Sequence, residues 1–329
     1  MALYVNTNVS SINAQRKLTN ATNSLNTSYQ RLASGLRINS AKDDAAGLQI
    51  ADRLTAQING LNQGNRNTND GIALAQTIEG ALDETTNMLQ RIRTLAVQAA
   101  TGTNTEQDRQ SLQEEVNELC QEITRIAEKT TFAGQDILNG EKSRNKLLNA
   151  DGQLFFQVGA NAYDTLTLNL AGFAMSQIAS QICDTNNQVK YDALANSAGT
   201  ALQPNAFNTA NLLSVGLLTK TADGTKGYVW SVSTAKTAQA TLNNIDKFIQ
   251  YVDSNRAALG AIQNRMESTI RNQSSISENE SDARSRIRDT DFASETATLT
   301  QNNIIQQASQ TVLAQANQRP TIALSLLGQ

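Results

Sequence analysis

The side chains that most often carry catalysis or bind metal ions are scarce in this sequence. Histidine is absent from the 329 residues, and the two cysteines, Cys120 and Cys183, stand far apart. Zinc sites of the usual kind need clustered cysteine or histidine ligands, so they and histidine-dependent catalysis are excluded or strongly disfavoured. One acidic cluster, 289-DTDFASE-295, accompanies no pocket motif and fits a charged helix end better than a paired-acid site. An enzyme is therefore only a minor alternative, and we expect no cofactor and no metal.

The two cysteines are better explained by packing than by reactivity. Cys120 lies beside an apolar heptad repeat, which predicts a small buried residue rather than a reactive thiol. A single cysteine pair in a long chain forms no disulfide framework, so a bridge between Cys120 and Cys183 is disfavoured but stays open.

Charge and composition limit the classes of partner that the chain is expected to bind. With 30 acidic and 27 basic residues, the net charge of −3 predicts no general attraction to nucleic acid or to an anionic membrane. The first residues, 1-MALYVNTNVSSINAQRKL-18, lack a basic stretch followed by an apolar run, so we expect no cleavable export signal. Two prolines and 4% aromatic residues favour long helices over a compact aromatic core.

Apolar residues at both ends of the chain recur at helical spacing, which predicts helices that pack on other helices. Gly35 ends the first repeat, and Ser40 with Asp43 predicts a capping box for the next helix. We call the apolar positions of the two ends the predicted seam. They are Val5, Val9, Ile12, Leu18, Leu25, Leu32, Leu36, Ile304, Ala308, Val312, Leu324 and Leu327.

Between the ends, the period changes twice. Heptad spacing continues to about Thr101 and resumes over residues 112–126, and residues 154–158 and 166–170 then alternate as two short antiparallel strands would. Residues 173–239 hold the single tryptophan and no sustained period, which predicts a small surface-exposed insert of mixed strand and loop. Heptad spacing returns beyond Ala240.

Each end of the chain lacks a partner in its own half, so we expect the two ends to pair antiparallel. The predicted fold is mainly α, a long antiparallel coiled-coil rod with short β-hairpins. Residues 1–42 and 289–329 would form a terminal domain, residues 43–172 and 240–288 a helical rod domain, and residues 173–239 the insert.

The chain ends also carry unusually few charges. They are Arg16, Lys17 and Arg31 up to Leu36, and Glu295 with Arg319 from Ala293 onward. A coiled coil alone in water normally carries charged flanking positions. Neutral polar faces therefore predict contact with further polypeptide, above all with copies of the same chain. Disordered ends are the alternative, and both states are compatible if the ends become ordered on assembly.

Several motifs in one order resemble the bacterial flagellins, and the resemblance covers about residues 1–172 and 240–329. They are 28-SYQRLASGLRINSAKDDAAGLQIADRL-54, 90-QRIRTLAVQAA-100, 131-TFAGQDILNG-140, 156-FQVGA-160 and 312-VLAQANQRPTIALSLL-327. The resemblance implies a structural subunit that polymerises with itself into the flagellar filament outside the cell, for swimming motility. It further implies that the terminal domain lines the filament core and folds on assembly, and that export uses the flagellar type III apparatus. The implied partners are an export chaperone, the filament cap and the hook-junction proteins.

The resemblance also implies two surface roles. Gln90, Arg91, Leu95 and Glu115 match the surface that the animal Toll-like receptor for flagellin recognises, although Thr94 departs from the acidic residue common there. Packing within and between subunits is the explanation we favour for these residues. Candidate positions for O-linked sugars in the insert are Thr209, Ser214, Thr219, Thr221 and Thr225.

A hook–filament junction protein is the nearest structural alternative, because it would share paired terminal helices without building a filament.

Removal of residues 293–329 tests whether the predicted seam is needed for polymerisation but not for folding of the core. Because the seam would lose one side, the truncated chain should fold its core yet form no filaments, as judged by circular dichroism and by electron microscopy of seeded samples. Normal polymerisation of the truncated chain would contradict the predicted seam.

Overall fold

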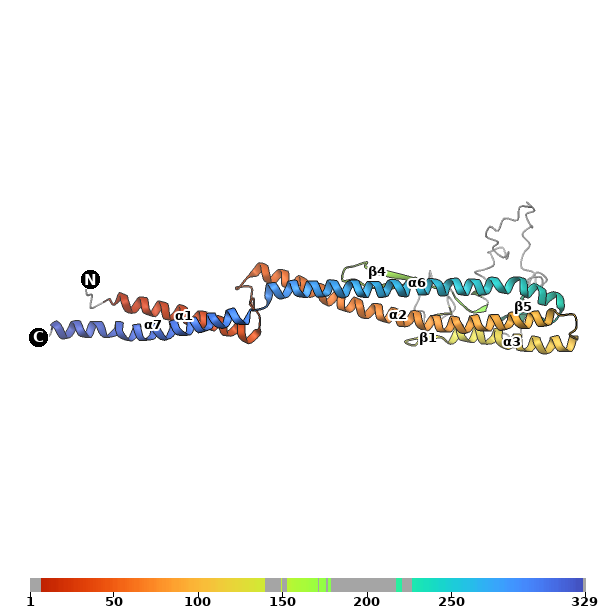
Figure 1. The fold of residues 1–329 in the computed structure, drawn as a ribbon, viewed down its shortest axis with the longest axis horizontal. Coiled ribbons are helices and arrows are strands. Elements are labelled where there is room, and N and C mark those ends of the chain that lie inside the picture. The colour runs from red at the N-terminus through yellow and green to blue at the C-terminus, as the bar shows by residue number, and fades with distance from the viewer. Residues whose placement is uncertain are drawn as a thin grey trace, which may run out of the picture. The chain divides into compact units, whose positions relative to one another are not determined.

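The computed structural model describes residues 7–139, 149, 153–170, 172–175, 177–178, 217–220 and 227–327. The chain divides into two compact units, Met1–Gly60 with Ser275–Gln329, and Leu61–Ser274. The helices in the described residues are α1 (Val9–Ser34), α2 (Ala45–Ala100), α3 (Glu106–Lys129), α6 (Ala235–Arg288) and α7 (Phe292–Leu327) (Figure 1). The prediction of a mainly α fold is confirmed. The three predicted domains stay a prediction.

Short antiparallel strand pairs complete the described elements. They are β1 (Thr131–Phe132) with β2 (Gln135–Asp136), β3 (Gln153–Gln157) with β4 (Thr165–Asn169), and β5 (Leu217–Lys220) with β6 (Gly227–Trp230). In the β3–β4 hairpin Leu154 pairs with Leu168, so the period-two alternation read from the sequence corresponds to real strands. The strand ends differ from the predicted ones by one residue.

The helix ends follow local capping chemistry. Thr105 and Asp108 form a capping box at the start of α3, and hydrogen bonds from Thr105 hold the pKa of Asp108 below its usual range. Gly35 adopts a left-handed conformation with φ 70 directly after α1, a conformation that glycine tolerates best. The cap predicted for the next helix is wrong by a few residues. Asp44 accepts the backbone N–H of Gly47 at the start of α2.

The core of the second unit lies among α2, α3 and α6 and is filled mainly by aliphatic side chains. Trp230 from β6 is fully buried and meets the Phe248 ring edge-on at a centroid distance of 4.8 Å. The side-chain amide of Gln113 on α3 makes two hydrogen bonds to the backbone at the end of this strand. It donates to the Trp230 carbonyl at 2.8 Å and accepts from the Val232 N–H at 2.6 Å. Together these contacts bring the chain back from the insert onto the core.

Both ends of the predicted insert belong to this core. Phe173 is buried, Trp230 and Val232 are buried, and α6 already begins at Ala235. The surface-exposed part of the insert is therefore shorter than predicted, because apolar residues at its two ends fill space between helices.

The turn after β3 is fastened to α2 and α6 at a glycine. A Cβ added at Gly64 would lie 1.8 Å from the carbonyl oxygen of Val158, so only glycine permits this approach. The same carbonyl accepts from the buried Gln273 amide at 2.6 Å, and the Gln157 carbonyl accepts from Asn67 at 2.9 Å. The glycine that weakens α2 as a helix is thus required for packing the hairpin.

Replacing Gly64 with alanine should destabilise the second unit by about 1 to 3 kcal/mol, because the hairpin must move away and the Gln273 hydrogen bond is lost. Gly80→Ala on the same helix is the matched control. An added Cβ there meets nothing within 4 Å, so its helix propensity should stabilise by up to about 1 kcal/mol. Thermal unfolding followed by circular dichroism measures both. Equal shifts in Tm would contradict the packing role of Gly64.

Cys120 offers a pH test of burial. Removal from water raises the pKa of its thiol from 9.0 to about 12, against the lowering effect of a hydrogen bond with the Trp230 backbone. The folded chain therefore keeps the proton while the unfolded chain loses it, so this contribution to stability is complete below pH 9 and falls as pH rises toward about 12. Urea unfolding over this range should show a smaller loss for Cys120→Ala than for the natural chain. A common pH dependence would contradict the buried-thiol assignment.

Candidate assembly surface

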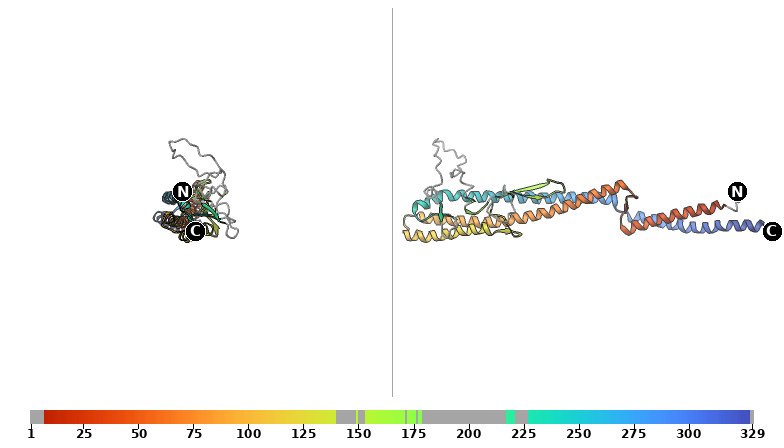
Figure 2. Two further views of the ribbon diagram at one scale, coloured as in Figure 1. Left: turned by 90° about the vertical axis from the view of Figure 1, so that its right-hand side faces the viewer. Right: turned by 180° about the vertical axis from the view of Figure 1, so that it is seen from behind.

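The two ends of the described chain pair as antiparallel helices. α1 and α7 lie side by side in Figure 1 and in the right-hand view of Figure 2. Near the start of α1, the Asn8 side-chain amide donates to the Ala316 carbonyl at 2.7 Å. Near its end, Arg31 forms an ion pair with Glu295 at 3.5 Å. Early residues of α1 thus meet late residues of α7, so the predicted antiparallel pairing of the ends is present in the first unit.

Small residues, more than large ones, form the contact between these helices. We call the inward positions the contact stripe. Its buried members are Ala14, Ala21, Leu25 and Ser28 on α1, with Ser309 and Ala316 on α7. Alanine or serine recurs every seven residues on both helices, which lets the two backbones come close. Such a stripe removes little apolar area from water, so the pair gains only modest stability from it.

Four of the predicted seam residues on α1 or directly after it are at least partly removed from water, and their role in assembly stays a prediction. Leu25 is buried, and Leu18, Leu32 and Leu36 are half-buried. Sequence reasoning followed the large apolar side chains and missed the alanine and serine repeat, although that repeat is visible in the sequence at the same seven-residue spacing. Val5 and the side chains of Leu324 and Leu327 lie outside the described residues.

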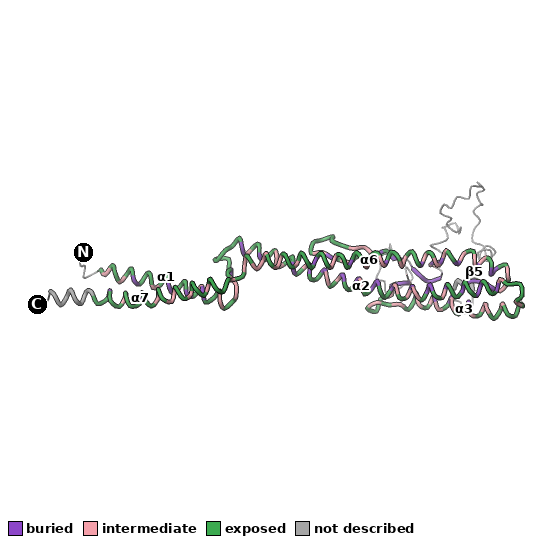
Figure 3. The backbone as a smooth tube through the Cα atoms, viewed as in Figure 1, coloured by how far each residue is buried: buried purple, intermediate pink, exposed green. Residues whose placement is uncertain are grey.

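The remaining large apolar residues of the predicted seam point away from the contact stripe. Val9 and Ile12 on α1 are 56% and 57% exposed, and Ile304 and Val312 on α7 are 62% and 55% exposed. Ala308 is exposed as well. The prediction that these five residues face the opposite terminal helix is therefore wrong. At about 100° per residue, Val9 and Ile12 lie well around α1 from the stripe, and Ile304 and Ala308 lie well around α7 from it. Val312 lies at the edge of the stripe and is exposed all the same. We call the five residues the outer face, and Figure 3 shows many exposed residues along the described parts of both helices.

Threonines on the outward sides of α1 and α7 satisfy their own hydroxyl groups. Each donates to the backbone carbonyl four residues earlier. They are Thr19, Thr27, Thr296, Thr298 and Thr300. Burial of such a residue leaves no hydroxyl donor unpaired, so these polar surfaces tolerate removal from water better than a charged surface would.

The residues matched to the receptor surface lie in the second unit. Gln90 and Arg91 are exposed on α2, and the Arg91 guanidinium pairs with the Glu115 carboxylate of α3 at 2.7 Å. This interhelical pair is about half exposed, so it stabilises by less than about 1 kcal/mol. Leu95 is only 1% exposed. The prediction of Leu95 as a contact residue is therefore wrong for the folded chain, where it is part of the core.

Other predicted positions are either inert or undescribed. Cys120 is a buried free thiol, as its place in the heptad predicts. Cys183, Thr209, Ser214, Thr221 and Thr225 lie outside the described residues, as does the side chain of Thr219. In the described part of the chain, no group of acidic, cysteine and histidine side chains is arranged to hold a metal ion. No helix there has the length and apolarity to cross a membrane.

Comparison with known proteins shows to which family a chain with this arrangement belongs. The family model of the bacterial flagellin N-terminal helical region matches residues 5–143, and that of the C-terminal helical region matches residues 242–327. Flagellin D of Vibrio cholerae serotype O1 is 42% identical over 380 residues, covering 100% of both chains. The chain belongs to the flagellin family. Flagellin D of Vibrio anguillarum is 41% identical, again over 100% of both chains.

As a flagellin, the chain is a structural subunit that polymerises with itself into the flagellar filament outside the cell. A putative flagellar hook-associated protein from Vibrio parahaemolyticus shares the fold, with a TM-score of 0.53 over 75% of this chain and 100% of that one. At 15% identity this likeness concerns the fold alone. The matched family regions are those of flagellins, so nothing favours the hook-junction alternative.

A leucine at a small position of the contact stripe tests the close approach of α1 and α7. Ala21→Leu should overpack the stripe by about 1 to 3 kcal/mol and lower the hydrogen-exchange protection of α1 several-fold. Ala33→Leu makes the same change at an exposed position of α1 and should leave protection unchanged. Equal protection in the two variants would contradict a stripe built on small residues.

Proposed function

We propose that copies of this flagellin meet through the outer face of α1 and α7, and that the terminal helices become ordered as they meet. The observation that carries the proposal is the exposure of Val9, Ile12, Ile304 and Val312 on a helix pair held by small residues. The terminal domain of residues 1–42 and 289–329 would then line the filament core. Head-to-tail repetition of such contacts generates an open helical polymer.

The energetics favour coupled ordering and assembly. Full burial of a valine or isoleucine stabilises by about 1.5 to 3 kcal/mol, and each of the four is more than half exposed in the single chain. A two-helix contact made by alanine and serine offsets little of the entropy lost when both helices become ordered. The contacts between copies supply the rest, so the free chain and the filament persist as separate states.

Charge supports the same surfaces. In a homopolymer each charge recurs on every copy, so like charges must be kept apart. α1 carries no acidic residue and α7 carries Glu295 alone, which pairs within the chain with Arg31. The outward positions are mostly Asn, Gln, Ser and Thr, which neighbouring copies can cover without uncompensated charge.

The remaining proposals follow from membership of the family. The chain would leave the cell through the flagellar type III apparatus and would meet an export chaperone, the hook-junction proteins and the filament cap in turn. It would act by assembly and not by catalysis. Residues Gln90, Arg91 and Glu115 would serve packing between subunits first, with contact to the Toll-like receptor for flagellin as a secondary role.

Polar replacement of the outer face tests the assembly surface. Ile304→Gln and Val312→Gln should each raise the critical concentration for polymerisation about 10-fold, because about 1.4 kcal/mol of apolar burial is lost per subunit. Ala314→Gln, at an exposed position about 120° around α7 from Ala308, is the control and should change it little. Seeded sedimentation and electron microscopy give the readout. Normal critical concentrations in both outer-face variants would show that copies meet elsewhere.

A further inference from the structure

The contact stripe does not by itself select one register for α1 and α7. On α1, Ala14, Ala21 and Ser28 repeat every seven residues, and on α7 Ser309 and Ala316 do the same. Sliding one helix by seven residues places a small residue opposite a small residue again. The two helices also have no short connecting loop, which is what fixes register in a helical hairpin. Another interaction must distinguish the native pairing from its shifted copies.

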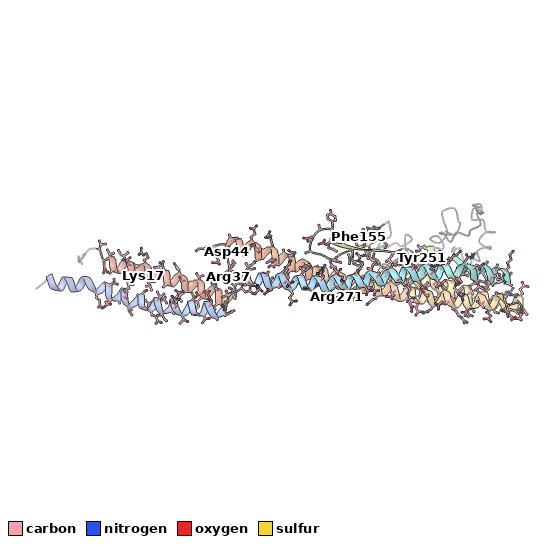
Figure 4. All side chains as sticks on the ribbon, turned by 45° about the horizontal axis from the view of Figure 1, so that its top comes forward. Lys17, Arg37, Asp44, Phe155, Tyr251 and Arg271 are labelled. Atoms are coloured by element: carbon pink, nitrogen blue, oxygen red, sulfur yellow. The ribbon has the colours of Figure 1, made fainter. Side chains whose placement is uncertain are left out.

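The connectors at one end of the pair hold each other through backbone groups. Leu36 and Asp289 form an isolated antiparallel bridge, and the Thr290 N–H donates to the Gly35 carbonyl at 3.0 Å. Arg37, which lies at the connector in Figure 4, donates its N–H to the Arg288 carbonyl at 2.7 Å. Nearly every residue type carries these backbone groups. These hydrogen bonds hold the two connectors together. Because they involve backbone groups alone, they do little to determine which side chains of α1 and α7 lie opposite one another.

The charged side chains of the two helices can distinguish the native register from a shifted one. Glu295 is the single acidic residue of α7, and α1 has none. Its carboxylate is 11% exposed and meets the Arg31 guanidinium, which is 31% exposed. The Oε1 atom of Glu295 and the Nε atom of Arg31 are buried without a hydrogen-bond partner. The Arg31 guanidinium also acts electrostatically on Asp43 of the connector, whereas Arg31 is the one ion-pair partner recorded for Glu295 in the described residues. A displaced Glu295 would remain a largely buried and uncompensated charge.

A shift by one repeat removes this partner. Moving α7 by seven residues sets Glu295 opposite Ser24 in one direction and beyond the end of α1 in the other. We infer that the Arg31–Glu295 ion pair is the specificity determinant that fixes the register in which α1 and α7 pair. The inference concerns pairing within one chain and holds whether or not the outer face meets other copies. A single polar pair in an apolar stripe sets coiled-coil register in the same way.

Engineered disulfides in the full chain measure the register directly. In the native register the Ser11 hydroxyl donates to the Asn317 side chain at 2.7 Å, so Ser11→Cys with Asn317→Cys reports it. Ser11→Cys with Gln310→Cys, one repeat earlier, reports the shifted register. The background carries Cys183→Ser, and the buried Cys120 stays unreactive. Both disulfide yields are measured on soluble chain and on filaments.

Arg31→Glu and Glu295→Arg should each lower the native-register disulfide about 3-fold or more and raise the shifted one. The double variant Arg31→Glu with Glu295→Arg should restore the native yield, since the charges are exchanged and the pair is kept. Arg16→Glu is the matched control. It makes the same charge change on α1, where Arg16 contacts Asn13 of its own helix, and should leave both yields unchanged.

Three results would overturn the inference. The single variants could keep the native disulfide, which would show that the connectors suffice. They could lose both disulfides, which would show that the ion pair stabilises the helices without choosing their register. The exchanged pair could also fail to restore the native yield. Filament formation is scored separately by electron microscopy, so a failure of the proposed outer face cannot be mistaken for a failure of register.

Discussion

An apolar side chain on a helix must be covered, and the α1–α7 pair covers mainly small ones together with Leu25. Alanine and serine bring the two backbones together, while isoleucine and valine remain on the outer face. A helix pair built in this way is incomplete as a single chain, because its valine and isoleucine side chains on the outer face are still more than half exposed to water. The behaviour expected of a filament subunit follows from this one division of apolar residues between inner and outer positions.

The second unit differs from the α1–α7 pair in how it buries its apolar side chains. Its core is filled by aliphatic side chains from three helices and closed by Trp230, so the unit has a buried apolar core of its own. Glycine destabilises an isolated helix, but in this unit a glycine is required for packing. Gly64 lowers helix propensity, yet the hairpin carbonyl of Val158 can approach α2 only there. The cost in propensity is offset by the docking of β3 and β4.

Much of the fold and part of the assembly surface could be predicted from periodicity. The helices, the β3–β4 hairpin and the antiparallel pairing of the chain ends follow from seven-residue and two-residue repeats. The faces of α1 and α7 could not be assigned in the same way. Two stripes run along each helix at similar spacing, one of small residues and one of large residues, and hydrophobicity alone ranks the large stripe first. Leu95 was misplaced for a related reason, since a motif shared with relatives does not state which of its residues are buried.

The sequence by itself determined the secondary structure, the neutral character of the chain ends and the family, because these depend on local propensity, charge and residue order. Only the tertiary structure decided which stripe of α1 faces α7, that the ends of the insert fill the core, and that Arg31 meets Glu295. These features depend on how closely two backbones can approach and on what lies across from each side chain. Residues almost 300 positions apart set those distances, and no local pattern in either segment contains them.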